Sequence, residues 1–122
     1  MALSREQLER YRKTAEMRMA EEARRASVRR ETAWRTAREA ARILKDQFFA
    51  TRVCAFGSIL RPESFSLWSD LDIAAWGLTP RNWLKASAAV RALSDGIEVN
   101  LLDIETCSDS LLHVIQRDGM TL

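Results

Sequence analysis

Residues 57 to 72 combine residue types that can bind a phosphate group and a metal ion. Gly57 and Ser58 end an apolar run. A glycine lets backbone N–H groups approach an anionic ligand, and a serine beside it adds a hydroxyl donor. Eleven residues separate Ser58 from Asp70, and Asp72 follows within an otherwise apolar segment. Alternate residues of a strand point to the same side, so we expect both carboxylates to project together.

Two carboxylates on one side of a strand repel each other unless a cation lies between them. The usual cation is a hard divalent metal with oxygen ligands, and Mg²⁺ also bridges nucleotide phosphates. Each half of the pattern is weak alone, because Gly-Ser and Asp-x-Asp are common in turns and at strand ends. Their combination indicates a site for a metal-bound polyphosphate.

The order of these residues resembles the signature of the minimal nucleotidyltransferases (MNT) of the DNA polymerase β-like superfamily. In that signature Gly-Ser closes one strand, an Arg follows in the connection, and Ser-Asp-x-Asp opens the next strand. The resemblance covers about residues 33 to 122. It implies that Gly57 and Ser58 bind the phosphates of a nucleoside triphosphate, with ATP as the expected substrate, and that Arg61 contacts phosphate or the acceptor. A salt bridge between Arg61 and Glu63 within the loop is the alternative for that arginine. It also implies that the two aspartates bind Mg²⁺, with two ions expected.

The third acidic position of this superfamily is altered here. A later strand typically carries an acid that completes the metal site and helps to deprotonate the attacking hydroxyl, and the matching residue is Asn100. Its carbonyl oxygen can coordinate Mg²⁺, but an amide cannot act as a base. Glu98 lies two residues earlier on the same face of the predicted strand and could substitute through its longer side chain. Substitution by Glu98, reduced activity through Asn100, and no transferase activity all stay open.

The resemblance is strongest to the antitoxin half of MNT and HEPN toxin–antitoxin pairs, in which the family transfers AMP to a tyrosine of the toxin. It implies an Mg²⁺-dependent nucleotidyltransferase that transfers AMP from ATP to a protein hydroxyl, with a HEPN-type toxin as partner. The alternative is a catalytically degenerate MNT fold that binds and masks a partner protein, with Asn100 as its mark.

The elements that must position these residues begin with a long helix. No Gly or Pro precedes Gly57, and Ser4 with Gln7 forms a capping-box pattern, so one helix or two in register should run to about residue 47. The remaining pattern predicts strands at 51–56, 70–76 and 97–104, helices at 81–93 and 110–117, a turn at 94–96 and a short edge strand at 120–122. This order predicts an α+β fold, with helices on a small mixed sheet of three to four strands, as in nucleotidyltransferases.

The long helix divides by composition into an N-terminal helical arm, residues 1–32, and the start of the nucleotidyltransferase domain, residues 33–122. Apolar residues follow a helical stripe from residue 33 onward but thin out between residues 21 and 32. The stripe returns near the amino end at Leu8 and Tyr11. This favours an arm that contacts a second copy of the chain or a different protein. A solvated helix held by Glu–Arg pairs is the alternative.

Composition limits the remaining function classes. The chain has 122 residues, 47% of them hydrophobic and 30% charged, which suits one folded domain. Residues 1 to 45 hold thirteen Arg or Lys against seven Glu (+6), and the rest hold six against ten acids (−4). The interspersed glutamates argue against nucleic acid as the partner. No segment is apolar enough for a membrane span or a secretory signal, which predicts a cytoplasmic location.

Cysteine and histidine usage predicts neither a disulfide framework nor hydrolase chemistry. Cys54 and Cys107 lack metal-ligand spacing, so we expect two reduced thiols. His113 is the single histidine and lies in a predicted amphipathic helix. A Ser-His or Cys-His mechanism would depend on that residue alone, which argues against it.

Overall fold

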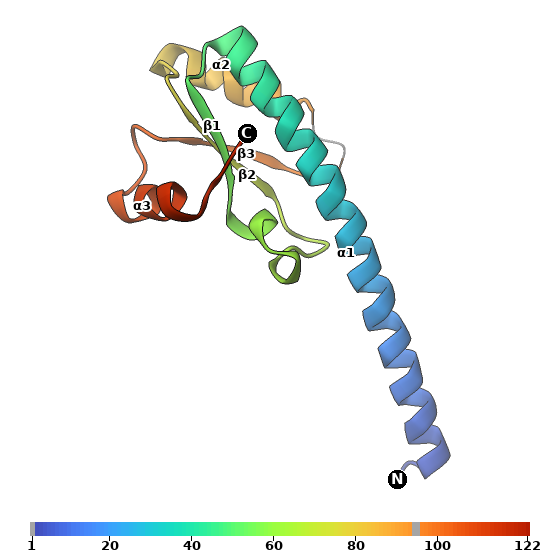
Figure 1. The fold of residues 1–122 in the computed structure, drawn as a ribbon. Coiled ribbons are helices and arrows are strands. Elements are labelled where there is room, and N and C mark those ends of the chain that lie inside the picture. Colours follow the sequence, from blue (N-terminus) through green and yellow to red (C-terminus); the bar gives the residue numbers. More distant parts are fainter. Residues whose placement is uncertain (1, 94–95) are drawn as a thin grey trace.

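The computed structural model describes residues 2–93 and 96–122 as one long helix, a four-stranded mixed sheet and two shorter helices (Figure 1). In chain order these are α1 (Arg5–Phe48), β1 (Arg52–Phe56), the 3₁₀ turns η1 (Gly57–Leu60) and η2 (Pro62–Ser64), β2 (Leu71–Trp76), α2 (Pro80–Arg91), β3 (Val99–Asp103), α3 (Asp109–Asp118) and β4 (Met120–Thr121). The predicted α+β class is confirmed. The two 3₁₀ turns were not predicted, and residues 94 and 95 of the predicted turn lie outside the described residues.

Helix α1 is continuous over 44 residues, so the single-helix alternative is confirmed. Its start is a capping box: the Ser4 N–H donates to Gln7 Oε1 at 2.9 Å, and the Gln7 N–H donates to Ser4 Oγ at 3.1 Å. Its end is set by Phe49, which has a positive φ of 62°, after which the Ala50 N–H donates to a helix carbonyl. The predicted domain boundary after residue 32 therefore falls within a continuous helix.

The sheet has the strand order β3-β2-β1-β4. Strand β1 is antiparallel to both β2 and β4, whereas β2 is parallel to β3. Parallel neighbours need a crossover connection, and α2 supplies it. In this register Phe56 at the end of β1 pairs with Asp72 of β2, and Asp72 pairs with Asn100 of β3. Asp72 and Asn100 therefore lie side by side near the starts of β2 and β3, next to the end of β1.

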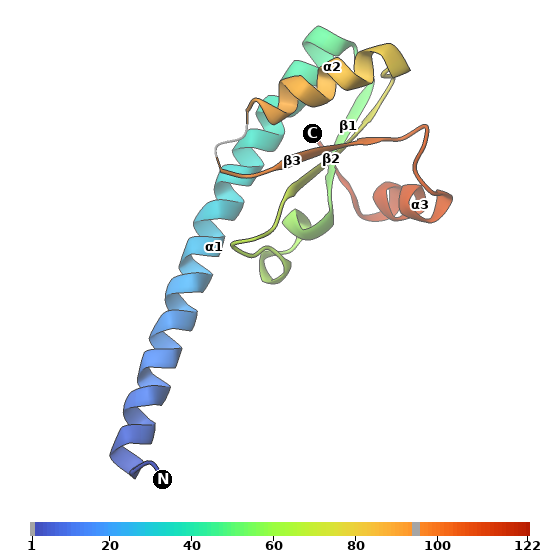
Figure 2. The same ribbon diagram turned by 180° about the vertical axis from the view of Figure 1, so that it is seen from behind.

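The helices cover the two faces of the sheet unequally. Helices α1 and α2 lie on one face and α3 on the other (Figures 1 and 2). Because alternate strand residues point to opposite faces, the strands bury two separate apolar clusters. The larger cluster, under α1 and α2, includes Leu44, Val53 and Ile73, and the smaller one, under α3, joins Cys54 to Ile115. The two cysteines are free thiols, as predicted.

The amino-terminal part of α1 projects beyond the sheet (Figures 1 and 2). Every residue from Ala2 to Arg25 is exposed, and we call residues 5–25 the free arm. Its exposed apolar side chains are Leu8, Tyr11, Met17 and Met19. No helix in the described part of the chain is both long enough and apolar enough to cross a membrane.

Candidate functional site

The predicted aspartates lie together on the α3 side of the sheet. Directly paired residues of neighbouring strands point to the same face, and Phe56, the partner of Asp72, packs in the cluster under α3. Leu71, between the aspartates, is fully buried on the opposite face, while Asp70 and Asp72 keep partial access to solvent. The expectation that both carboxylates project from one side of the strand is therefore confirmed.

Both carboxylates reach one atom of Asn100. The Asn100 Nδ2 donates to Asp72 Oδ1 at 3.2 Å and lies 3.4 Å from Asp70 Oδ2. Because both carboxylates lie close to Nδ2, one ion at that position could contact both acids. Carboxylate oxygens and an amide carbonyl are ligands that Mg²⁺ takes in proteins, so the donor set fits such an ion once the Asn100 amide rotates to turn its oxygen, in place of Nδ2, toward the acids.

Gly57 brings the serine loop against the same carboxylates. It has a φ of +80°, and a Cβ added to it would lie 2.8 Å from Asp72 Oδ2. The position therefore needs glycine both for its left-handed backbone and for its close approach to Asp72. The peptide of Gly57 and Ser58 is held at the end of β1, beside the aspartates, as the sequence predicted.

Ser58 and Arg61 lie at a cavity whose lining reaches Gly57 but neither Asp70 nor Asp72. The Arg61 N–H donates to the Ser58 carbonyl oxygen at 3.4 Å, which closes the turn η1. Both residues, together with Gly57, line a cavity of about 590 Å³ between η1, η2 and the end of α3. The three residues that we expected to bind phosphate therefore share one recess, with Gly57 common to the recess and the carboxylate pair.

Burial is the main cause of the shifted pKa of Asp72. Burial raises the pKa of the Asp72 carboxyl above its ordinary value, because the charged form loses hydration. The hydrogen bond from Asn100 acts in the opposite direction, and the negative charge of Asp70 raises the pKa further. A cation between the acids would relieve both the burial cost and the mutual repulsion.

Glu98 is held beside the start of β2 through its main chain. It precedes β3 and is exposed, and its main-chain oxygen accepts a hydrogen bond from the Leu71 N–H at 2.9 Å. Among the described residues, no group of three or more His, Cys, Asp or Glu side chains is placed to hold a metal ion. The role of Glu98 stays a prediction.

Two arginines of α1, not predicted from the sequence, hold the backbone that carries the site. Arg29 donates to the carbonyl oxygens of Ser69 and Gly96, both at 3.0 Å, and Arg30 Nε donates to the Ile59 carbonyl oxygen at 2.8 Å. Ser69 precedes the first aspartate and Ile59 follows the serine of η1. No sequence signal distinguishes these two arginines from their many neighbours on α1.

No protein-family model matches the chain, and no curated protein sequence is significantly similar to it.

Proposed function

We propose that the protein is an Mg²⁺-dependent nucleotidyltransferase that transfers AMP from ATP to a protein hydroxyl. One observation carries the proposal: Asp70 and Asp72 meet at a single Asn100 atom, at 3.4 and 3.2 Å. Asp72 of this pair adjoins Gly57, at the turn suited to phosphate binding. Support also comes from the order of these residues in the sequence, which resembles that of the MNT family.

The chain's own residues would act mainly by positioning. Asp70, Asp72 and the Asn100 carbonyl oxygen, after rotation of the amide, would hold Mg²⁺. The ion supplies charge neutralisation on the phosphates and on the departing pyrophosphate. Ser58 and Arg61 would orient the phosphate tail, and the α1 arginines would keep the loops of the site in place. Ser58, Arg61 and the Asn100 amide cannot act as bases, so the proton of the acceptor hydroxyl would pass to a carboxylate of the pair or to solvent.

The acceptor in this proposal is a tyrosine of a HEPN-type toxin, for which the protein acts as antitoxin in the cytoplasm. This part rests on the resemblance to MNT antitoxins. The free arm, with its exposed Leu8 and Tyr11, is available to contact the toxin or a second copy of the chain.

A degenerate binding module is the second candidate, and Asn100 is the observation that favours it. Its amide N–H group donates to both carboxylates where the superfamily has a third acid. An amide donor partly satisfies the two acids without any cation. In that case the fold would mask a partner protein without transferring AMP.

Calorimetric titration of the protein with ATP and Mg²⁺ tests the proposal. We expect Mg²⁺-dependent binding that is lost in the double variant Asp70→Asn/Asp72→Asn, which keeps side-chain shape but removes both charges. Asp46→Asn, an exposed acid of α1, is the matched control and should bind as the wild type does. Equal binding by the wild type and the double variant would remove the aspartates from the proposed role.

Asn100→Asp separates the two candidates. A third carboxylate should tighten Mg²⁺-dependent ATP binding and raise AMP transfer to the partner if the protein is a weakened enzyme. A binding module predicts that neither the wild type nor Asn100→Asp transfers AMP, while both still bind the partner.

A further inference from the structure

The cavity beside η1 has a second wall that the sequence did not indicate. This wall is the carboxyl end of α3, which contributes Val114, Arg117 and Asp118, opposite Ser58 and Arg61 of the loop. The cavity measures about 590 Å³ and opens to solvent. It therefore lies between two segments that are far apart in the chain and that each carry an arginine.

Arg117 of this cavity already binds a carboxylate, that of Asp118. Arg117 donates from Nε to Asp118 Oδ1 at 3.0 Å and from Nη2 to Asp118 Oδ2 at 2.8 Å. This two-point geometry is the one by which a guanidinium binds a phosphate. The hydrogen bond from Arg117 lowers the pKa of Asp118, and the charges of Arg61 and His113 lower it further. Arg117 is thus the hydrogen-bond partner of Asp118, and Arg61 lines the same cavity.

The internal pair is easy to replace. Both Arg117 and Asp118 are exposed, and the ion pair between them is screened by water. A phosphate group carries more charge and more acceptor oxygens than a carboxylate. It can therefore replace Asp118 as the hydrogen-bond acceptor of Arg117 at little cost in free energy. Arg61 and Arg117 together exceed the charge of Asp118, which leaves the cavity net positive.

We propose that Arg117 is a further binding residue for the terminal phosphates of a polyphosphate ester in this cavity, with Asp118 as its internal competitor. The inference rests on the proposed function in one respect: Gly57 lines the cavity and lies beside Asp72, so a phosphate tail bound in the cavity would lie near the proposed metal site. The anion site itself depends on α3 and the loop and needs no metal.

Titration with pyrophosphate in the presence of EDTA tests the site without Mg²⁺. Arg117→Gln should weaken pyrophosphate binding by about tenfold, as loss of a charged hydrogen-bond donor predicts. Asp118→Asn should strengthen it several-fold, because the competing carboxylate is gone. Arg91→Gln, an exposed arginine on α2 across the sheet, is the control and should leave the affinity unchanged.

Opposite effects of Arg117→Gln and Asp118→Asn on pyrophosphate affinity would identify a ligand site. If the Arg117–Asp118 pair only stabilised α3, both variants would lower the melting temperature and change pyrophosphate binding in the same direction. That result, or equal pyrophosphate affinity in wild type and Arg117→Gln, would overturn the proposal.

The double aspartate variant separates this proposal from the proposed function. Asp70→Asn/Asp72→Asn should retain metal-free pyrophosphate binding while it loses Mg²⁺-dependent ATP binding. If the α3 variants act as predicted but ATP and Mg²⁺ bind equally to the double variant, the phosphate site stands and the transferase proposal fails. If the aspartates matter but the α3 variants have no effect, the reverse holds.

Discussion

The free arm and the docked half of α1 belong to one helix, yet only one of them is packed. In residues 33–48, Ala37, Ala40 and Leu44 are fully buried against the sheet and α2. In the free arm, Leu8 and Tyr11 occupy similar helical spacing but remain exposed. The helix therefore extends beyond the elements that pack against it, and burial of its apolar residues depends on which elements the fold brings alongside it.

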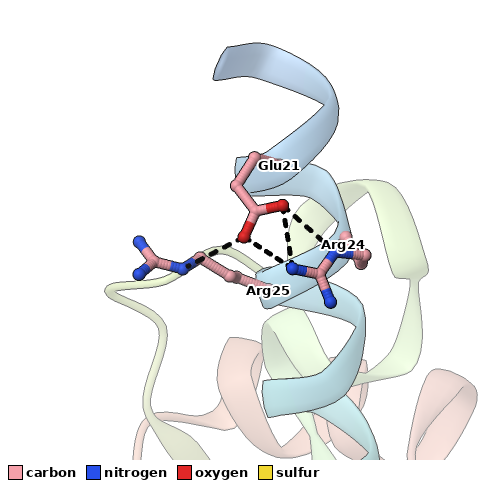
Figure 3. A network of polar contacts seen from close by, with 3 residues as sticks. All are labelled: Glu21, Arg24 and Arg25. Atoms are coloured by element: carbon pink, nitrogen blue, oxygen red, sulfur yellow. Dashed lines mark hydrogen bonds and ion pairs between the residues drawn. The ribbon is translucent and has the colours of Figure 1, made fainter. Parts of the chain in front are cut away.

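The acids of the free arm and of the candidate site also differ in their exposure to water. Glu21 of the arm accepts from Arg24 at 2.6 Å and lies 3.7 Å from Arg25, all in solvent (Figure 3). The hydrogen bond from Arg24 lowers the pKa of Glu21, whereas burial raises the pKa of Asp72. An acid held with a raised pKa costs folding stability near neutral pH, so a binding role gives a reason for its presence.

Leu44→Ala should have the largest effect on stability among the substitutions that test the difference between packed and exposed parts of the molecule. Truncation of a fully buried leucine is expected to lower the free energy of unfolding by about 2–5 kcal/mol. Urea unfolding followed by circular dichroism measures this loss. Leu8→Ala, the same change in the free arm, should leave the unfolding midpoint unchanged, and a comparable loss there would show that the arm is packed in solution.

Arg30→Met tests the connection between α1 and the site loop. Loss of the charged donor to the Ile59 carbonyl, 2.8 Å away, should lower the free energy of unfolding by about 1.5–3 kcal/mol. Amide hydrogen exchange should also become faster in residues 57–61. Arg24→Met removes an arginine from the free arm and should change neither quantity, so equal behaviour of the two variants would contradict the role assigned to Arg30.

Asp72→Asn should have a smaller and pH-dependent effect. Because the folded protein keeps the Asp72 proton to a higher pH than the unfolded chain does, this group makes wild-type stability fall as pH rises from about 3.8 through the raised pKa. The variant lacks this titration, so it should be more stable than the wild type at pH 7. The difference should shrink at acid pH, below the unfolded value.

Urea unfolding of both proteins between pH 3 and 8 measures that difference. A wild type that gains stability over Asp72→Asn as pH rises would reverse the assigned sign and contradict the burial of this carboxyl.

Glu21→Gln should have the smallest effect. The carboxylate and both arginines are exposed, so water and salt screen their attraction (Figure 3). The melting temperature should match that of the wild type at both low and high salt. A salt-dependent decrease would mean that the arm uses this network for more than a solvated helix surface.

Much of the fold could be predicted because its signals are local. The capping box at Ser4, the run without Gly or Pro, and the alternation around Asp72 each depend on neighbours in sequence. Strand boundaries were less accurate: the third strand spans Val99–Asp103, shorter than the predicted 97–104. Strand ends depend on pairing with β2, which no local pattern records.

The site was predicted in part for the same reason. Gly57, Ser58 and the two aspartates were identified from residue type and spacing. The contacts made by Arg29 join residues 67 and 40 positions apart, and the wall formed by Arg117 comes from the end of the chain. Such residues look like ordinary surface arginines until the chain folds.

The sequence by itself determined the long capped helix, the alternating strands and the pairing of two carboxylates on one side, because each follows from the geometry of a few consecutive residues. Only the tertiary structure decided the contacts themselves: Asn100 Nδ2 reaches both carboxylates, Gly57 lies against Asp72, and α3 closes a charged cavity nearby. These contacts depend on strand order and helix placement, which are set by burial of apolar surface across the whole domain.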